Sequence, residues 1–506
     1  MKYYIVADLG ASNGRVMVAC YENKKFDFDI VHRFDNTPVL SGDGELFWDI
    51  LSIFHEIKTG IRIAVNKYHH IQSIGIDTFG CDFAILDEHG RLMGNPIHYR
   101  NEAQYTMSQK LHEILSEQEL FELAQGPCSR VMGIYKLYAL KEMDAFEYKY
   151  GAHILMIPDL LNYMLTGKIS TEFTNATMML MANQKKRDWE PEICRRLGLR
   201  DDMLTRMEEP GTRLGPLKQS ICKELELEPI DVVIPATHDT AAAVTGIPVQ
   251  DPDVPWGFLS LGTWALGGLE RKEPVLDKRI VELEFGNEGG TFGRTMLLKN
   301  LTGMWIIQQC RNYWNRTLAT PLSWDEIVKL AETAEEQECV IDIDWEAFNN
   351  YQSNMPAVIQ QYCEYTGQVV PKTTGEISQC IYRSMALKIR ESFESILTIL
   401  EEKIELLHIV GGGTQNHLVC QWISNAMDIP VVAGPTETTA TGNLIFQLYA
   451  DGEVSSLEDG RKVCADSSEL YKVKPEDQKL WNEKYLYYCK ILKRMKEYET
   501  SKRINK

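Results

Sequence analysis

Short hydrophobic runs separated by polar turns open the chain and predict a group of strands. Five such runs are residues 3–7, 16–21, 26–34, 71–76 and 83–86. Runs of this length, rich in Val, Ile, Phe and Tyr, are typical of strands. Residues 48–64 differ, because their apolar positions recur at the spacing of one helix face. The first part of the chain therefore predicts several strands interrupted by a helix.

The strand–turn–strand pattern of the first residues returns near the middle of the chain. Residues 256–260 and 264–269 predict two strands around the turn Leu261-Gly262-Thr263. We interpret the chain as two similar halves, residues 1–245 and 246–506, and its class as α/β. Pro and Asp residues gather where the two halves meet.

Helical patterns occupy much of the remaining sequence. Residues 104–200 are mostly helical in pattern, and residues 376–403 predict one long amphipathic helix. Short strands are predicted at 231–235 and 407–410, each followed by a polar or glycine-rich turn. The last residues, 490–506, are basic and predict a fraying helical tail exposed to solvent.

Length, charge and cysteine content exclude several classes of protein. A chain of 506 residues is too long for one ordinary core, and 44% hydrophobic with 25% charged residues is typical of a folded soluble protein. The formal net charge, 53 − 72 = −19, argues against nucleic acid as a partner, because phosphate backbones need a basic surface. The twelve cysteines are scattered without a C-x-x-C pair, so we expect reduced thiols and no cysteine-bound metal.

The hydropathy pattern also bears on location. No apolar run reaches the length of a membrane span, and the first residues lack the long apolar region of a secretion signal. We expect a cytoplasmic protein that has no membrane partner and binds a small molecule. Whether it is a monomer or a homodimer stays open.

Three glycine-rich turns follow predicted strands: residues 8–15, 260–262 and 411–413. Glycine lets backbone N–H groups approach a phosphate closely, although each turn alone is more typical of an ordinary loop. A carboxylate or hydroxyl accompanies each turn, with Asp8 in the first and Thr263 and Thr414 after the others. The P-loop, protein-kinase, H-E-x-x-H and G-x-S-x-G motifs are absent. A bound nucleotide would therefore be held by hairpin turns.

Other polar segments could contact a substrate that carries hydroxyl groups. His238-Asp239-Thr240 lies between a strand and a helix, where Asp239 could accept the proton of a substrate hydroxyl. The alternative is a plain helix N-cap. Residues 77–82 could line a polyol pocket or form a charged loop. Asn300 and Gln308 would be ordinary surface residues on this pattern alone.

Taken together, these segments resemble those of the FGGY carbohydrate kinases, within the actin-like ATPase superfamily. The matching segments are residues 8–15, 73–80, 237–240, 260–264, 287–290, 298–300, 408–413, 415–416, 433–435 and 441–443. They occur in the family's order over nearly the whole chain. Within the family they are most similar to members that phosphorylate the 1-hydroxyl of L-rhamnulose. Asn13, Phe79 and Cys81 depart from that pattern, and Phe79 has no indole N–H to donate.

The resemblance implies two RNase H-like domains with a cleft between them, the sugar mainly on residues 1–245 and ATP mainly on residues 246–506. By this resemblance Asp239 would be the catalytic base, and Asp8 would act on Mg²⁺ directly or through its waters. The ketose would contact Gly80, His238, Asp239, Thr240 and Asn300. The ATP contacts would come from Ala11, Ser12, Asn13, Gly14, Arg15, Thr263, Gln308 and Gly412.

Three alternatives stay open on the sequence. The first is a kinase of the same family that acts on L-fuculose, a pentulose or glycerol. The second is an actin-like assembly or chaperone ATPase, which would hydrolyse ATP without sugar and would not need residues 237–240. The third is a catalytically silent sugar sensor, against which the presence of Asp8 and Asp239 argues.

Overall fold

The computed structural model describes residues 1–101 and 103–504. It contains two compact units, each with its own sheet and helices. The first unit consists of residues 1–250, 270–298 and 437–468, and the second of residues 251–269, 299–436 and 469–506. The first break in the chain lies close to the predicted boundary at residue 245. Two segments of the predicted second half, residues 270–298 and 437–468, pack within the first unit.

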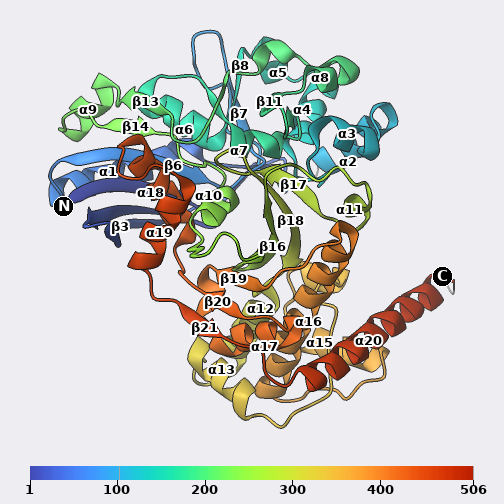
Figure 1. Ribbon diagram of the computed structural model, residues 1–506. Helices are drawn as coiled ribbons and strands as arrows, with labels where there is room; N and C mark the ends of the chain where they lie inside the picture. The colour runs from blue at the N-terminus through green and yellow to red at the C-terminus, as the bar shows by residue number, and fades with distance from the viewer. Residues whose placement is uncertain (102, 505–506) are drawn as a thin grey trace. The chain divides into compact units, whose positions relative to one another are not determined.

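The first unit is built on a six-stranded sheet with the order β13-β14-β6-β1-β2-β3 (Figure 1). Its strands are β1 (Lys2–Leu9), β2 (Asn13–Glu22), β3 (Lys25–Asp35), β6 (Ile71–Thr78), β13 (Arg213–Pro216) and β14 (Asp231–Val233). The central strand β1 runs antiparallel to β2 and parallel to β6. These strands confirm the predictions for residues 3–7, 16–21, 26–34 and 71–76. Because β1, β6 and β14 are parallel, their carboxyl ends lie at the same edge of the sheet.

Helices cover this sheet, and one of them comes from the far end of the sequence. Helix α1 (Ile50–Lys67) agrees with the predicted helix and is capped by Asp49, whose side chain accepts from the N–H of Ser52. Helix α18 (Thr438–Ala450) buries Leu444 and Leu448 with Tyr4 and Val6 of β1. This shared core explains why residues 437–468, with α19 (Leu457–Ser467), belong to the first unit.

Helices α10 (Asp239–Thr245) and α18 lie in close contact (Figure 1). A Cβ atom on Gly442 would stand 1.9 Å from the carbonyl oxygen of Ala242. Only glycine permits this approach, so the start of α10 is fixed against α18.

The region predicted to be mostly helical is so, with short strands between its helices. The helices are α2 (Ala103–Ile114), α3 (Glu117–Ala124), α4 (Gly133–Glu142), α5 (Phe146–Tyr150), α6 (Ile157–Thr166), α7 (Phe173–Ala176) and α8 (Pro191–Leu197). The strands are β8 (His153–Met156), which pairs with β7 (Phe83–Leu86), and the two-residue strands β9 (Thr171–Glu172), β10 (Ala182–Asn183) and β11 (Asp188–Trp189). The hairpin of β17 (Gly286–Gly289) with residues 295–298 of β18 (Thr295–Thr302) also belongs to this unit.

The second unit repeats the strand arrangement of the first. Strand β15 (Trp256–Leu261) is antiparallel to β16 (Trp264–Arg271) and parallel to β19 (Leu406–Val410), as β1 is to β2 and β6. Strands β20 (Val431–Ala433) and β21 (Tyr471–Val473) continue the sheet beyond β19. The predicted repetition of a strand–turn–strand opening is thus confirmed at the level of strand pairing.

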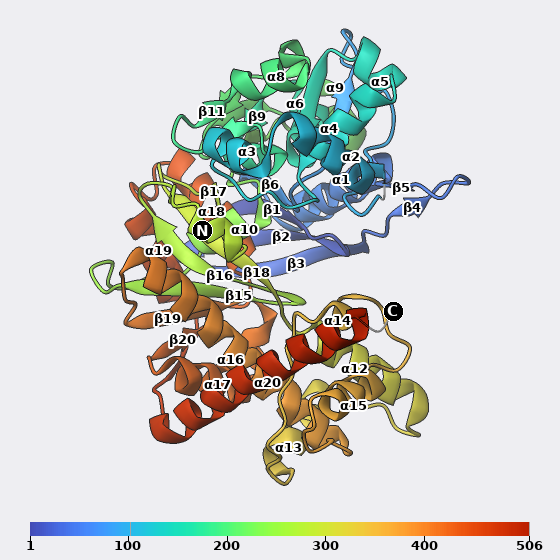
Figure 2. The ribbon, with the colours of Figure 1, turned by 90° about the vertical axis from the view of Figure 1, so that its right-hand side faces the viewer.

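Long helices enclose the large apolar core of the second unit. They are α12 (Trp305–Thr317), α13 (Trp324–Thr333), α15 (Met355–Tyr365), α16 (Thr374–Leu400), α17 (His417–Met427) and α20 (Gln478–Ile504). Figure 2 shows α16, α17 and α20 side by side. Helix α16 ends three residues before the predicted position, because Glu401 adopts a left-handed conformation with φ 55°.

The basic tail is more than a solvated end. Helix α20 starts twelve residues before the predicted position, at Gln478, and buries Trp481, Tyr488, Ile491 and Met495 in the core of the second unit. Residues 505–506 of the predicted tail lie outside the described part of the chain. Among the described residues, none of the helices combines the length and hydropathy that crossing a bilayer requires.

Candidate active site

Three chain segments meet at the carboxyl ends of β1 and β6 in the first unit. Asp8 of β1 stands opposite Asp77 of β6 in the parallel register. The N–H of Thr78 donates to the carbonyl of Thr237 at 2.8 Å, and the N–H of Phe79 donates to the carbonyl of Leu9 at 3.0 Å. These bonds bring together Asp8, Gly80 and His238-Asp239, which are far apart in the sequence.

Arg15 is held between two carboxylates beside the first glycine-rich turn. Its guanidinium donates to Oδ2 of Asp8 at 2.5 Å and lies 2.6 Å from Oε2 of Glu437. Burial raises the pKa of the Asp8 carboxyl, while the charge of Arg15 acts in the opposite direction. The side chains of Ser12 and Asn13, at the tip of the turn, are exposed. The turn therefore offers one paired cation and open polar groups to an anionic ligand.

A ladder of side-chain amides supports Asp77 from α18. Asn443 donates to Oδ2 of Asp77 at 2.7 Å, Gln447 donates to Oδ1 of Asn443 at 2.8 Å, and Ser73 donates to Gln447 at 2.7 Å. All four side chains are buried. A Cβ on Gly75 would lie 2.2 Å from Oδ1 of Asn443, so glycine is required where this ladder crosses β6. The other carboxylate oxygen of Asp77, Oδ1, has no hydrogen-bond partner among the described residues.

Asp239 is the first residue of α10. Its carboxylate is partly exposed, but the surrounding protein removes much of its hydration. Its side chain is 36% exposed, and Thr240 donates to its Oδ1 at 3.3 Å. Loss of hydration raises the pKa of Asp239 to about 6. His238 precedes it and is buried, with Nε2 3.5 Å from Oδ1 of Asp239. Burial lowers the pKa of His238, which keeps the imidazole neutral near pH 7.

Glu172 is a buried carboxylate that fixes the segment before Asp239. It accepts from the hydroxyls of Thr174 and Thr237, both at 2.6 Å, and from the N–H groups of Thr174, Asn175 and Thr237. The hydroxyl of Thr174 in turn accepts from the N–H of His238 at 3.2 Å. Sequence reasoning missed Glu172. The only available signal was a charged residue followed by Phe-Thr-Asn-Ala in an otherwise apolar stretch.

Gly80 and Glu288 lie on two sides of the His238 ring. A Cβ on Gly80 would lie 3.1–3.2 Å from Cδ2 and Nε2 of the imidazole, so a larger residue would displace the ring. Oε2 of Glu288, on β17, lies 3.6 Å from Nδ1 of His238. In the sequence, Glu288 stands out only as part of segment 287–290, and nothing there points to a role for it.

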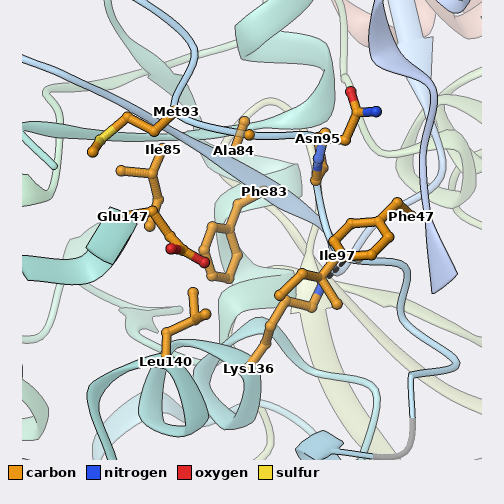
Figure 3. A pocket seen from close by; sticks show the side chains of 12 residues that line it. Phe47, Phe83, Ala84, Ile85, Met93, Asn95, Ile97, Lys136, Leu140 and Glu147 are labelled. Carbon is orange, nitrogen blue, oxygen red and sulfur yellow. Dashed lines mark hydrogen bonds between the residues drawn. The ribbon is translucent and has the colours of Figure 1, made fainter. Parts of the chain in front are cut away.

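Asp82, which closes the predicted pocket loop, is buried in an ion pair with Lys136 of α4. The indole of Trp48 also donates to Asp82 at 2.5 Å and stacks on Phe79. Lys136 contributes to the wall of a neighbouring cavity of about 130 Å³ (Figure 3). Figure 3 shows the ring of Phe83 at the centre of this cavity's side chains. Among the described residues, none of the predicted ligand residues lines this cavity. The cavity is therefore separate from the candidate site.

The predicted nucleotide residues of the second unit gather around the β15–β16 turn. The amide of Gln308 on α12 lies 3.3 Å from the hydroxyl of Thr263. The N–H groups of Met304 and Trp305 donate to the carbonyls of Gly262 and Thr263, which pins the start of α12 to this turn. Asn300 also belongs to the second unit and is exposed on β18.

The third glycine-rich turn follows β19, the parallel neighbour of β15. Gly411 has φ 86°, a conformation that favours glycine. A Cβ on Gly412 would meet nothing within 4 Å, whereas one on Gly413 would lie 2.4 Å from the Leu261 side chain. Gly412 is exposed and Gly413 is buried. Gly412 is thus open to a ligand, while Gly413 packs against the turn next to it.

Two family models match the chain. The N-terminal domain of the FGGY family of carbohydrate kinases matches residues 3–246, and the C-terminal domain of the same family matches residues 257–450. The chain belongs to the FGGY family of carbohydrate kinases. Its two-unit α/β architecture is the two-domain fold of that family.

Curated relatives of this FGGY kinase are similar over nearly the full length. The rhamnulokinase of Bacteroides thetaiotaomicron is 33% identical over 485 residues, which cover 96% of this chain and 98% of the relative. The rhamnulokinase of Bacillus subtilis is 34% identical over 476 residues, 94% of this chain and 96% of the relative.

Solved structures show the same fold at low sequence identity. The gluconate kinase of Lactobacillus acidophilus has a TM-score of 0.80 at 16% identity, covering 97% of both chains. The ligand-bound xylulose kinase of the same organism has a TM-score of 0.78 at 16% identity, covering 97% of this FGGY kinase and 98% of that chain.

Proposed function

We propose that this kinase transfers the γ-phosphoryl group of ATP to the 1-hydroxyl of L-rhamnulose, giving L-rhamnulose 1-phosphate in L-rhamnose catabolism. The observation that carries the chemistry is the position of Asp239, a partly hydrated carboxylate fixed beside Asp8 and Gly80. The rhamnulokinase relatives, at 33–34% identity, support the choice of sugar.

Asp239 acts as the general base in this proposal. A pKa of about 6 leaves its carboxylate ionised at pH 7 yet basic enough to accept a proton. As the ketose oxygen bonds to the γ-phosphorus and the bond to ADP breaks, the hydroxyl proton passes to a carboxylate oxygen of Asp239. The hydroxyl of Thr240 holds that carboxylate in place. Phosphoryl transfer depends mainly on such positioning and on charge neutralisation.

The remaining contacts are divided between the two units. In the first unit, the ketose is bound by Gly80, His238 and Thr240, and the terminal phosphates by residues 11–15 with the charge of Arg15. In the second unit, Asn300 contributes to sugar binding, and Thr263, Gln308 and Gly412 hold the nucleotide. These assignments explain why glycine stands at positions 80 and 412, where a side chain would reach the His238 ring or a ligand.

Mg²⁺ fits the first unit through Asp8. The described residues contain no group of three or more His, Cys, Asp or Glu side chains able to hold a metal ion. This agrees with the ion's habit of taking one or two carboxylates and completing its shell with phosphates and water. Oδ1 of Asp77, which is buried opposite Asp8 without a hydrogen-bond partner among the described residues, would supply a second hard oxygen there. The ion would neutralise phosphate charge when bound, and Asp8 would hold it directly or through water.

ADP release, coupled to a reporter, tests the proposal. Purified protein with Mg·ATP is assayed against L-rhamnulose, L-fuculose, D- and L-xylulose, L-ribulose and glycerol, with a blank lacking sugar. We expect release that depends on sugar, with the highest kcat/KM for L-rhamnulose. A different best sugar would move only the substrate assignment, whereas release without sugar would remove the role given to Asp239.

A further inference from the structure

We propose that Glu288 is a positioning residue of the ketose site, which holds the His238 imidazole with its Nδ1–H directed at Glu288. Nε2 then carries a lone pair and accepts a hydrogen bond from a hydroxyl of the sugar. This inference rests on the proposed function for the identity of the ligand, but the arrangement of Glu288 and His238 is a property of the free protein.

The first observation is that Nδ1 of His238 and Oε2 of Glu288 are buried polar atoms that face each other. Nδ1 of His238 and Oε2 of Glu288 are 3.6 Å apart, and neither has a hydrogen-bond partner among the described residues. The exposed fraction is 4% for His238 and 2% for Glu288. Buried polar groups are rarely left unpaired, because each one costs the hydration that it loses. A distance slightly beyond a hydrogen bond is common in free enzymes and shortens when substrate binds.

The second observation is that the backbone on both sides of Glu288 is anchored. The backbone carbonyl of Asn287 accepts from Nε2 of Gln184 at 3.1 Å, and the N–H of Gly289 donates to the hydroxyl of Thr177 at 3.0 Å. The side-chain amide of Asn287 also donates to the carbonyl of Gln125 at 2.7 Å. A Cβ on Gly289 would lie 3.0 Å or less from atoms of Thr174 and Thr177, so β17 is seated tightly on this region. Glu288 therefore faces His238 from a rigid support rather than from a loop.

The chemistry of the pair selects one tautomer. A neutral imidazole carries its proton on either nitrogen, and an ionised carboxylate can only accept. Glu288 therefore favours the proton on Nδ1. Nε2, next to Gly80 and 3.5 Å from Oδ1 of Asp239, is left as an acceptor. In the other tautomer Nε2–H would donate to Asp239 and weaken it as a base. A glutamine at 288 could either donate or accept and would lose this selection.

Histidine ¹⁵N NMR of the free, uniformly labelled enzyme tests the tautomer without any sugar. The His238 signals are assigned by their loss in His238→Gln. We expect a protonated Nδ1 and a non-protonated Nε2 in the wild type, and a mixture or reversal in Glu288→Gln. A wild-type His238 protonated on Nε2 would overturn the proposal, whichever ketose is the substrate.

Steady-state kinetics then test the consequence with the best sugar of the panel. We expect Glu288→Gln to raise the KM for the ketose about tenfold, the effect of one lost hydrogen bond, with the KM for ATP within about twofold. Glu288→Asp should recover part of the loss, since it keeps an acceptor-only side chain. Glu458→Gln, which removes an exposed carboxylate paired with Arg294 in the same unit, is the control and should leave both constants unchanged. An unchanged ketose KM in Glu288→Gln, or equal changes in both constants, would contradict the proposal.

Discussion

The hairpins β1–β2 and β15–β16 share one backbone plan and differ in the charges that they carry. Each has a central strand that ends in a Leu-Gly pair, with the leucine buried, and each is flanked by a parallel neighbour, β6 or β19. The first hairpin places Asp8 before that pair and Arg15 after the turn, in contact at 2.5 Å. The second has Ser260 before its pair and Leu266 opposite it on β16, while Thr263 in the turn has Gln308 as its partner.

The shared backbone frame therefore does not by itself decide which ligand groups a turn can bind. A buried carboxylate such as Asp8 is tolerated because the charge and hydrogen bond of Arg15 compensate part of its lost hydration. The second hairpin needs no such compensation, because the side chains of Ser260, Thr263 and Gln308 are neutral and none of them is fully buried. We therefore expect the first unit to control the rate of phosphoryl transfer and the second to control nucleotide affinity.

Asp239→Asn is the substitution with the largest expected effect on this comparison. Asparagine keeps the size of the side chain and cannot accept the hydroxyl proton, so kcat should fall about 10³-fold or more. Binding of ATP, measured by calorimetry, should stay within about twofold of wild type, because the nucleotide residues are elsewhere. Turnover close to wild type would show that another group is the base.

Which residues of the candidate site could be predicted from the sequence depends on how far apart in the sequence the contacting residues are. Asp8, Gly80 and Asp239 lie at or after the ends of strands whose hydrophobic runs are recognisable locally, but it was the resemblance to the FGGY family that implied one shared site for them. Glu437 could not, because its contact with Arg15 joins residues 422 positions apart, 437 − 15 = 422. A single sequence carries no signal for such a pairing, nor for the packing of α18 on β1 that creates it.

The buried polar groups of the first unit also depend on contacts between residues far apart in the sequence. Glu172 looks like an ordinary polar residue in the sequence, and Asn443 stands out only as part of segment 441–443. Their contacts arise only when the fold brings Thr237 or Asp77 beside them. Segments 270–298 and 437–468 likewise join the first unit through tertiary packing, for which hydrophobic runs carry no local signal.

A paired substitution at the two hairpins compares them directly. Asp8→Asn removes the only carboxylate of the first turn and should lower kcat about 10²-fold, because charge stabilisation at the phosphates is lost. Ser260→Ala at the corresponding place should change kcat less than about threefold, since a neutral hydroxyl contributes little to charge stabilisation. Steady-state kinetics with saturating ATP and ketose measure both. Equal losses would mean that the charge difference between the hairpins is not functional.

The pH dependence should report the carboxylates of the first unit. Because the pKa of Asp239 is raised to about 6, kcat/KM for the ketose should be constant above pH 7 and fall about tenfold for each pH unit below 6. The sign for stability is the opposite. The folded state holds this proton more tightly than the unfolded state, so this group's contribution to the free energy of unfolding decreases as the pH rises from about 4 to about 6. A kcat/KM profile that stays flat down to pH 5 would contradict the assignment.

The smallest expected effect separates ligand contact from packing in the second unit. Gly412→Val should weaken ATP binding about tenfold and leave Tm unchanged, because its new side chain would enter open space that the proposed function gives to the nucleotide. Gly413→Val, one residue along, should lower Tm, since its Cβ would stand 2.4 Å from Leu261. Calorimetric titration with ATP and thermal unfolding measure the two quantities in both variants. If Gly412→Val lowered Tm as much as Gly413→Val, loss of ATP affinity would reflect damage to the fold, and Gly412 would have no place in the nucleotide site.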